Sequence, residues 1–419
     1  MANSVSASFK EFWSRTMQRK HFKNDVFRAI ASFREEEVLK KGDTVNRPYR
    51  SKIVTQTYTR GTAFTVQDLT DTNEQLTVQT SKIAPFYVDD LDELQHDYAL
   101  AASYAGDAAV ALGNFIEGDV LGEYDQTNLN IEDDDMNVGG TSGVGFTLNT
   151  GNIQKMFAVA KKKLKRKSAD TKLFAVISPD VEQVLMEYLA GKESQLGDSS
   201  GLNGNIGKYY GFDLYVSNSC GWSSTLAMPT IPTDGDAITL KVADPETAET
   251  TITITFVDTL SAATGASEVH IASTVDITRA NLVEFLNAPS TSETEATDTG
   301  YSSMSTANAN LLIGVTATND NTADTMTLKG EGKSFIVVGE TLTPAGDIWT
   351  SNLQVQHQLF GQKGAIDVVI QKRPNVEFKE VPDKLGRNVA PWTLYGLKTF
   401  NDGKSEFVDV KVRSDAFVN

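Results

Sequence analysis

The sequence predicts an α+β protein that carries an inserted all-β or mainly-β segment. Three patterns lead to this class: a threonine-rich, strand-like stretch over residues 46–86, a helix-length apolar stripe from Leu91 to Val120, and a strand-rich acidic stretch over residues 225–344. At 419 residues the chain exceeds what one hydrophobic core usually serves. We therefore expect two or three packed units.

Residues 1–45 form the first predicted unit, an N-terminal arm. Residues 1–60 hold 13 Lys and Arg against 6 Asp and Glu, a net charge of +7, although the whole chain carries −17. Aromatic and basic residues are mixed here without one clean helical face, so we expect the arm to be ordered by packing on neighbours. Its basic residues are Lys10, Arg15, Arg19, Lys20, Lys23 and Arg28.

Residues 46–86 predict a long β-hairpin with two largely polar faces. The stretches 51–60 and 74–82 are rich in Thr, Val, Ile and Tyr, and the second alternates polar with apolar residues. An isolated hairpin of this kind is marginal in water. We therefore expect it to lie on another subunit.

A long helix is predicted from about residue 89 to 124. Apolar or small residues recur from Leu91 to Val120 at a mean spacing close to the helical 3.6. Acidic residues at the start suit the positive end of the helix dipole. Such a helix would be roughly 50 Å long at 1.5 Å per residue.

From about residue 149 the sequence predicts a helix, a buried strand, a second helix and a further β segment. A first helix carries the apolar stripe Ile153, Met156, Phe157, Ala160 and Leu164. Its basic run, 161–167, has three open interpretations: a solvated face, a contact for an acidic neighbour, or a nucleic-acid patch.

A buried strand, LFAVI, follows this helix. Ser178 is placed to cap the next helix, Pro179 takes its first position, and Gly191 stands where a C-cap is expected.

Residues 225–344 predict the inserted unit. Six strand-like, threonine-rich stretches surround one helix expected over about Ile277–Leu286. The segment holds 16 Asp and Glu against 4 Lys and Arg, a net charge of −12. We expect it to face away from any nucleic acid, which would repel it; the alternative is an insertion tolerated at an exposed loop.

The sequence predicts no catalytic, cofactor or metal site. Cys220 is the only cysteine, and the four histidines show no metal-ligand spacing, so we interpret them as solvated or core-edge residues. A phosphate-loop motif is absent from the sequence. We interpret the pair Asp367/Glu377 and the run Asp133–Asp135 as surface charge. Neither a membrane-spanning run nor a signal peptide is evident.

The order of these elements resembles the tailed-bacteriophage major capsid proteins with the Hong Kong 97-type fold. The resemblance rests on IGKYYGFDLYVSN (206–218), KGAIDVVI (363–370), LYGLKTF (394–400) and VDVKV (408–412), together with the arm, hairpin and long helix. It implies a peripheral domain with a spine helix over 87–148 and an axial domain over 149–224. Residues 345–419 would return through both.

The resemblance implies a shell protein that assembles into pentamers and hexamers of an icosahedral head around viral DNA. The basic arm would face inward, and an insert of this kind occurs in several phage head proteins. The implied partners are itself, a separate scaffolding protein, a portal protein at one vertex, packaged double-stranded DNA and a decoration protein. The implied location is the virion, after assembly in the host cytoplasm. Expected inter-subunit contacts on the hairpin are Ile53, Thr55, Thr57, Tyr58, Phe64, Leu76 and Val78.

Three rival functions stay open at this point. An encapsulin-like nanocompartment shell resembles the same fold but encloses cargo enzymes, and the large acidic insert counts against it. A virion tube or fibre protein would suit the threonine-rich strands but not the long helix. An enzyme with an accessory β domain finds no phosphate loop and no metal-ligand cluster in the sequence to support it.

Overall fold

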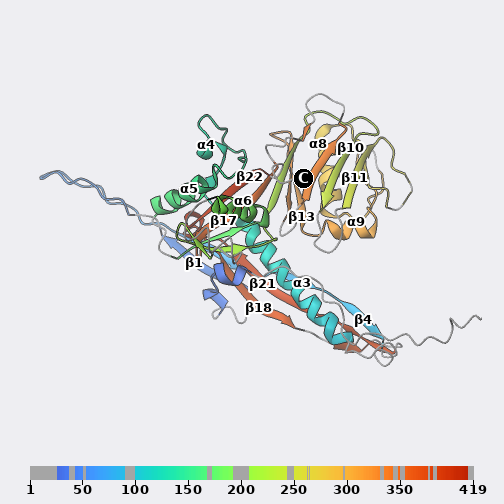
Figure 1. Cartoon of the computed structure of the whole chain (residues 1–419), viewed down its shortest axis with the longest axis horizontal. Coiled ribbons are helices and arrows are strands. Elements are labelled where there is room, and N and C mark those ends of the chain that lie inside the picture. Colours follow the sequence, from blue (N-terminus) through green and yellow to red (C-terminus); the bar gives the residue numbers. More distant parts are fainter. Residues whose placement is uncertain are drawn as a thin grey trace, which may run out of the picture.

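The protein is a mixed α and β structure with three parts that lie side by side (Figure 1). The computed structural model describes residues 26–36, 43–50, 53–89, 100–167, 172–191, 207–242, 250–261, 263, 265–295, 298–330, 335–342, 348–349, 354–375, 378–380 and 385–413. One part gathers α5, α6, β17 and β22, a second gathers α8, β10 and β11, and a third follows the long helix α3 with β18 and β21.

A ten-stranded sheet joins the first part to the second. Its main path runs β13-β14-β9-β17-β6-β8-β7, and β16, β22 and β5 pair beside that path. The strands of this sheet are β5 (Asn130–Ile131), β6 (Leu173–Ile177), β7 (Lys208–Tyr209), β8 (Phe212–Val216), β9 (Trp222–Ala227), β13 (Val315–Asp320), β14 (Thr325–Gly330), β16 (Ile348–Trp349), β17 (Val355–Gln362) and β22 (Phe407–Arg413).

The first part has its core between this sheet and two helices, α5 (Ile153–Arg166) and α6 (Pro179–Ala190). All five residues of the predicted apolar stripe on α5 are buried, as the helical spacing predicted. Ser178 Oγ accepts the Val181 N–H at 3.3 Å, and Gly191 follows α6 as its C-cap. These local predictions are confirmed.

The third part is built on α3 (Leu100–Gly122), which covers about two thirds of the predicted long helix. Residues 90–99, where we expected its first turns, lie outside the described residues. Its buried face packs on two sheets, β18-β21-β3 and β19-β20-β4, and on the N-terminal turn. Their elements are α1 (Phe27–Ile30), η2 (Arg34–Glu36), β3 (Thr80–Ile83), β4 (Phe86–Asp89), η3 (Glu123–Gln126), β18 (Asp367–Asn375), β19 (Phe378–Glu380), β20 (Gly386–Val389), β21 (Trp392–Lys398) and η5 (Gly403–Ser405).

The second part has a separate hydrophobic core formed by residues between Trp222 and Leu328. Its four-stranded sheet, β12-β11-β10-β15, is covered by α8 (Val275–Asn287), which confirms the helix expected over 277–286. The remaining elements are β10 (Ala237–Val242), β11 (Thr250–Val257), β12 (Glu268–His270), α9 (Thr306–Leu311) and β15 (Phe335–Glu340). The boundary we predicted at 224/225 falls inside β9, because this strand continues the large sheet.

The predicted hairpin is paired only at its base. β1 (Thr44–Arg50) and β2 (Asp71–Thr77) are antiparallel, from Thr44 opposite Thr77 to Arg50 opposite Asp71. Residues 53–70, where we expected most of the first strand, carry no assigned strand. The ladder forms where Val45 and Leu76 are buried, since packing on the body stabilises it there.

A short helix, α4 (Asp133–Met136), completes the described secondary structure next to α5. None of the helices in the described ranges has the length and apolar character needed to span a bilayer.

Candidate assembly surface

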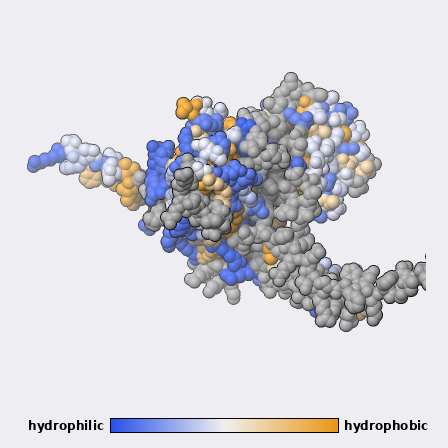
Figure 2. Space-filling view, viewed as in Figure 1, coloured by the Kyte–Doolittle hydropathy of each residue, from blue (hydrophilic) through white to orange (hydrophobic). Residues whose placement is uncertain are grey.

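The most conspicuous surface feature is the projecting loop, residues 53–69, which extends away from the body beyond β1 and β2 (Figure 1, blue, at the left). Gly61, with φ of +86°, lies at its turn, where Thr62 N donates to Thr59 O at 3.1 Å. Figure 2 shows hydrophilic colour at the tip and hydrophobic colour nearer the body. The apolar surface of the loop therefore lies between its hydrophilic tip and the body.

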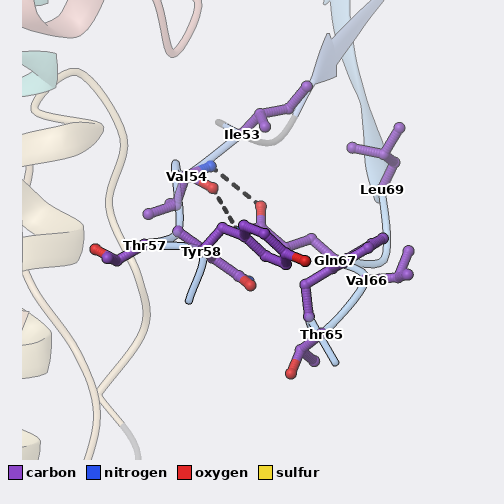
Figure 3. Close-up of a pocket in the computed structure, with 10 residues that line it drawn as sticks. Ile53, Val54, Thr57, Tyr58, Thr65, Val66, Gln67 and Leu69 are labelled. Atoms are coloured by element: carbon purple, nitrogen blue, oxygen red, sulfur yellow. Dashed lines mark hydrogen bonds between the residues drawn. The ribbon is translucent and has the colours of Figure 1, made fainter. Parts of the chain in front are cut away.

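Six large hydrophobic side chains on this loop are between 62% and 77% exposed. They are Ile53, Val54, Tyr58, Phe64, Val66 and Leu69. Single exposed apolar residues are ordinary, whereas a group of this kind on one loop is a candidate contact surface for another molecule. The two arms of the loop enclose a hollow of about 670 Å³ lined largely by the same side chains (Figure 3).

The side chain of Gln67 holds the two arms of the loop together. Its Oε1 accepts the Val54 N–H at 3.1 Å, and its Nε2 donates to Val54 O at 2.7 Å (Figure 3). One amide thus satisfies both backbone groups of Val54, as a neighbouring strand would. Tyr58 lies over this bridge in the hollow (Figure 3).

The base of the loop is fixed to the body by Arg47 on β1. Its Nη1 donates to Asp367 Oδ2 at 3.1 Å and its Nη2 to Asp402 Oδ2 at 2.6 Å. The guanidinium also lies 4.9 Å from the centre of the Phe400 ring. Glu74 on β2 accepts the Asn401 N–H at 3.0 Å, so both strands of the base contact the same turn.

Two of the seven expected contact residues are not on this surface. Leu76 and Val78 are buried in the chain's own core with Val369 and Phe400, so they are unavailable to a neighbour. The alternating pattern marked them as one face of a strand, but that face packs on the body. The other five, Ile53, Thr55, Thr57, Tyr58 and Phe64, all lie exposed on the loop.

Sequence reasoning also missed residues that the structure brings to this surface. Val54, Val66 and Leu69 are exposed beside the expected ones, and their apolar character in a polar hairpin was the available signal. Gln67 and Arg47 act through contacts that no local pattern specifies. Asp367, interpreted as surface charge, is only 6% exposed and is paired with Arg47. Its partner in that interpretation, Glu377, lies outside the described residues.

The basic arm is described only from Val26 onward. Lys10, Arg15, Arg19, Lys20 and Lys23 lie outside the described residues, and Arg28 is exposed. The described part of the arm begins beside α3, where Val26 N donates to the buried Glu117 carboxylate at 2.9 Å. Phe27 and Ile30 are buried against the same helix.

The basic run on α5 divides into two groups. Lys161 Nζ donates to Tyr210 O at 2.7 Å, and Lys163 Nζ donates to Asn130 O at 2.5 Å and pairs with Asp135. These two lysines therefore fasten neighbouring loops. The remaining basic residues, Lys162, Lys165, Arg166 and Lys167, are exposed.

Within the described residues, His, Cys, Asp and Glu form no group of three or more that suits a metal ion. The acidic run on α4 serves the local structure. Asp133 accepts the Thr141 N–H at 3.1 Å and the Asn137 side-chain amide at 2.5 Å, and Glu132 and Asp135 form a capping box.

No protein-family model and no curated protein sequence matches the chain. Solved structures do match over nearly its whole length. A chain of the structure described as "Mycobacterium phage Che8" is 13% identical with a TM-score of 0.54, over 97% of this chain and 98% of that one. A chain of "Capsid structure of the Cyanophage P-SCSP1u" is 12% identical with a TM-score of 0.52, over 98% and 95%. The chain therefore shares the fold of these two phage chains.

Proposed function

We propose that this chain is the major capsid protein of a tailed bacterial virus. The observation that carries the proposal is the projecting loop, whose apolar side chains are exposed in the part of the chain that the structure describes. The fold shared with a chain of a cyanophage capsid supports it. In this proposal the chain works by assembly and has no need of a catalytic centre.

The occupant of the loop's apolar surface would be a second copy of the chain. A loop on one side of the body that contacts the next copy makes a head-to-tail interface, which closes into a ring when the rotation permits. Rings of five and six subunits would tile an icosahedral head. Each contact can be weak because every subunit makes several, and their effects combine. The proposed contact residues are Ile53, Thr55, Thr57, Tyr58 and Phe64, with Val54, Val66 and Leu69 added by the structure.

The polarised charge of the chain suggests which side faces the packaged genome. The basic arm, with Lys10, Arg15, Arg19, Lys20, Lys23 and Arg28, would face inward to DNA or to a separate scaffolding protein. The acidic segment 225–344 would face outward, where a decoration protein has access. A portal protein would occupy one vertex of the finished virion, assembled in the host cytoplasm. Charge reversal at four of the basic residues should impair assembly or packaging, and unchanged particles would contradict this orientation.

The assembly proposal is tested by adding a charge to the loop. Tyr58→Asp and Phe64→Asp should leave the melting temperature of the subunit unchanged, because both side chains are already exposed. Each should abolish closed particles in negative-stain micrographs of the chain expressed with its scaffolding partner, because the new carboxylate would be buried unpaired at the interface. Val138→Asp is the matched control, since Val138 is fully exposed but lies beside α4, away from the loop.

Normal closed particles from both loop variants would overturn the proposed role of the loop. A wild-type chain that stays monomeric under all conditions would overturn the capsid proposal itself. Particles that contain a cargo enzyme and no DNA would assign the chain to the encapsulin-like alternative.

A further inference from the structure

The imidazole of His357 lies between a carboxylate and a hydroxyl on two neighbouring strands. Its Nδ1 is 2.9 Å from both carboxylate oxygens of Asp409 on β22, and its Nε2 is 2.8 Å from Ser223 Oγ on β9. Nucleophilic serine sites require this order, with the carboxylate at Nδ1 and the serine at Nε2, whatever the fold. The three residues are far apart in sequence, so no spacing pattern predicted their contact.

The surroundings hold the imidazole in place and select its tautomer. Asp409 and His357 are only 2% and 5% exposed. The ring of Tyr124 stacks on the imidazole at 3.6 Å with 9° between the planes, and His357 N donates to Gly221 O at 2.8 Å. The Asp409 carboxylate can only accept a hydrogen bond, so Nδ1 carries the proton and Nε2 presents its lone pair to the Ser223 hydroxyl. His357 is therefore set as a base toward that hydroxyl.

A hollow of about 290 Å³ opens beside Ser223, which is half-buried. Its lining includes Ser223, His357 and Asp409 together with Thr225 and Lys411. Thr225 stands two residues after Ser223 on the same face of β9, and Lys411 is a cation held by Glu132 at 2.7 Å. The volume suits a small acyl group, since ligand pockets usually start at about 300 Å³.

We propose that Ser223, His357 and Asp409 form an acyl-accepting serine site for small esters. Ser223 Oγ attacks the ester carbonyl carbon while its proton passes to His357 Nε2. The bond from that carbon to the alkoxy oxygen breaks, and the leaving alcohol takes the proton from Nε2. The products are an ester on Ser223 and a free alcohol. Water that attacks the same carbonyl carbon releases the acid by the reverse proton transfers and restores the serine.

The site should react slowly. Ser223 and Thr225 pair with Lys329 and Thr327 of β14, so the backbone near Ser223 belongs to a strand ladder. Stabilisation of the oxyanion would fall to the side chains of Lys411 and Thr225. Loss of one positioned oxyanion donor costs about 10² to 10³ in rate. Covalent labelling, which accumulates product, therefore suits this site better than turnover.

The test is labelling of the purified full-length subunit, before assembly, with diisopropyl fluorophosphate, followed by intact-mass and peptide mass spectrometry. We expect one adduct, located on Ser223 and absent from Ser223→Ala. His357→Gln should lower the labelling rate at least about 100-fold, because general-base catalysis contributes 10² or more. Ser224→Ala should label normally, since Ser224 points to the opposite, buried face of β9.

Asp409→Asn tests whether Asp409 sets the tautomer of His357 or only supports the fold. Its amide N–H would donate to Nδ1 and leave the proton on Nε2, so labelling should fall at least about 100-fold. A melting temperature measured for each variant identifies any that fail to fold. No adduct above the Ser223→Ala background, or labelling unaffected by His357→Gln in folded protein, would overturn the proposal.

Discussion

Arg47 and Asp367 form an ion pair between Nη1 and Oδ2 at 3.1 Å across 320 residues of sequence. Asp367 is almost completely buried at the start of β18, whereas Arg47 stands at the base of the projecting loop. The same guanidinium reaches Asp402, so one side chain ties the loop to two separate elements of the body. We expect this contact to fix the direction in which the loop leaves the body.

Arg47→Ala should therefore lower the free energy of unfolding by about 1–3 kcal/mol, since it leaves the buried Asp367 carboxylate without its charged donor. It should also reduce assembly, because the loop loses its fixed direction. Urea denaturation and particle yield measure the two effects. Arg50→Ala, an exposed arginine on the same strand, is the control and should change neither. Equal effects of the two variants would show that net charge, and not this contact, matters.

Gln67 is predicted to set the spacing between the two arms of the loop. Gln67→Glu keeps an acceptor for the Val54 N–H but loses the donor to Val54 O. The bridge that holds the Val54 amide is then weaker by one hydrogen bond of about 1 kcal/mol, so it should open more often and this amide should exchange its hydrogen about fivefold faster. Hydrogen exchange read by mass spectrometry over 53–69 measures this. Gln56→Glu adds the same charge elsewhere on the loop and should leave the exchange rate as it is.

Asn287 closes the outer edge of the ten-stranded sheet. Its Nδ2 donates to Ala317 O at 3.0 Å and its Oδ1 accepts the Ala317 N–H at 2.8 Å, so a side chain from α8 satisfies both backbone groups of Ala317 on the edge strand β13. An uncovered edge is a template for pairing with another chain. Asn287→Ala should lower stability by about 0.5–1.5 kcal/mol.

The same variant should also associate with increasing concentration in sedimentation experiments on unassembled subunits. Asn310→Ala, on the neighbouring helix α9, is the matched control and should remain as the wild type. If Asn287→Ala sediments identically at all concentrations, the edge is protected by something other than this amide.

The parts of the fold that the sequence predicts are those governed by contacts within about one turn or one strand. The stripe from Ile153 to Leu164 and the cap at Ser178 follow from helix geometry, and the structure has both. Leu76 shows the limit of prediction from local contacts. Its alternation with polar neighbours indicates a one-sided strand, but only the tertiary contact with Val369 decides whether that side faces this chain or another.

Only part of the candidate assembly surface could be predicted from the sequence, because some of its contacts join residues that are distant in the chain. Exposed Tyr58 and Phe64 follow from apolar residues in a polar hairpin, whereas Gln67 and Arg47 act on residues that sequence distance hides. Ser223 and His357 are the extreme case, because three strands that are not adjacent in sequence must pair before these side chains meet. Long-range pairing of this kind leaves no periodicity in the chain to read.

Glu132 is predicted to make the segment 132–146 depend on pH. Burial opposes its charge, but the Lys411 ammonium at 2.7 Å and the Gly143 N–H at 2.5 Å outweigh it and hold the pKa of the carboxyl below its ordinary value. A depressed pKa in the folded protein means that the ionised carboxylate stabilises the fold at neutral pH. That stabilisation is lost as the pH falls through the folded pKa, which lies below the ordinary value of a glutamate carboxyl.

Glu132→Gln should thus unfold more easily than the wild type at pH 7, by about 1–3 kcal/mol, because Lys411 loses its charged partner. The difference should shrink as the solution is acidified through the lowered pKa of Glu132, because the wild-type carboxyl then takes up its proton. Thermal unfolding from pH 3 to pH 7 measures both. Asp134→Asn, an exposed carboxylate on α4, should follow the wild-type curve. A gap between Glu132→Gln and wild type that stays constant over this range would show that shape, and not charge, accounts for the effect of Glu132.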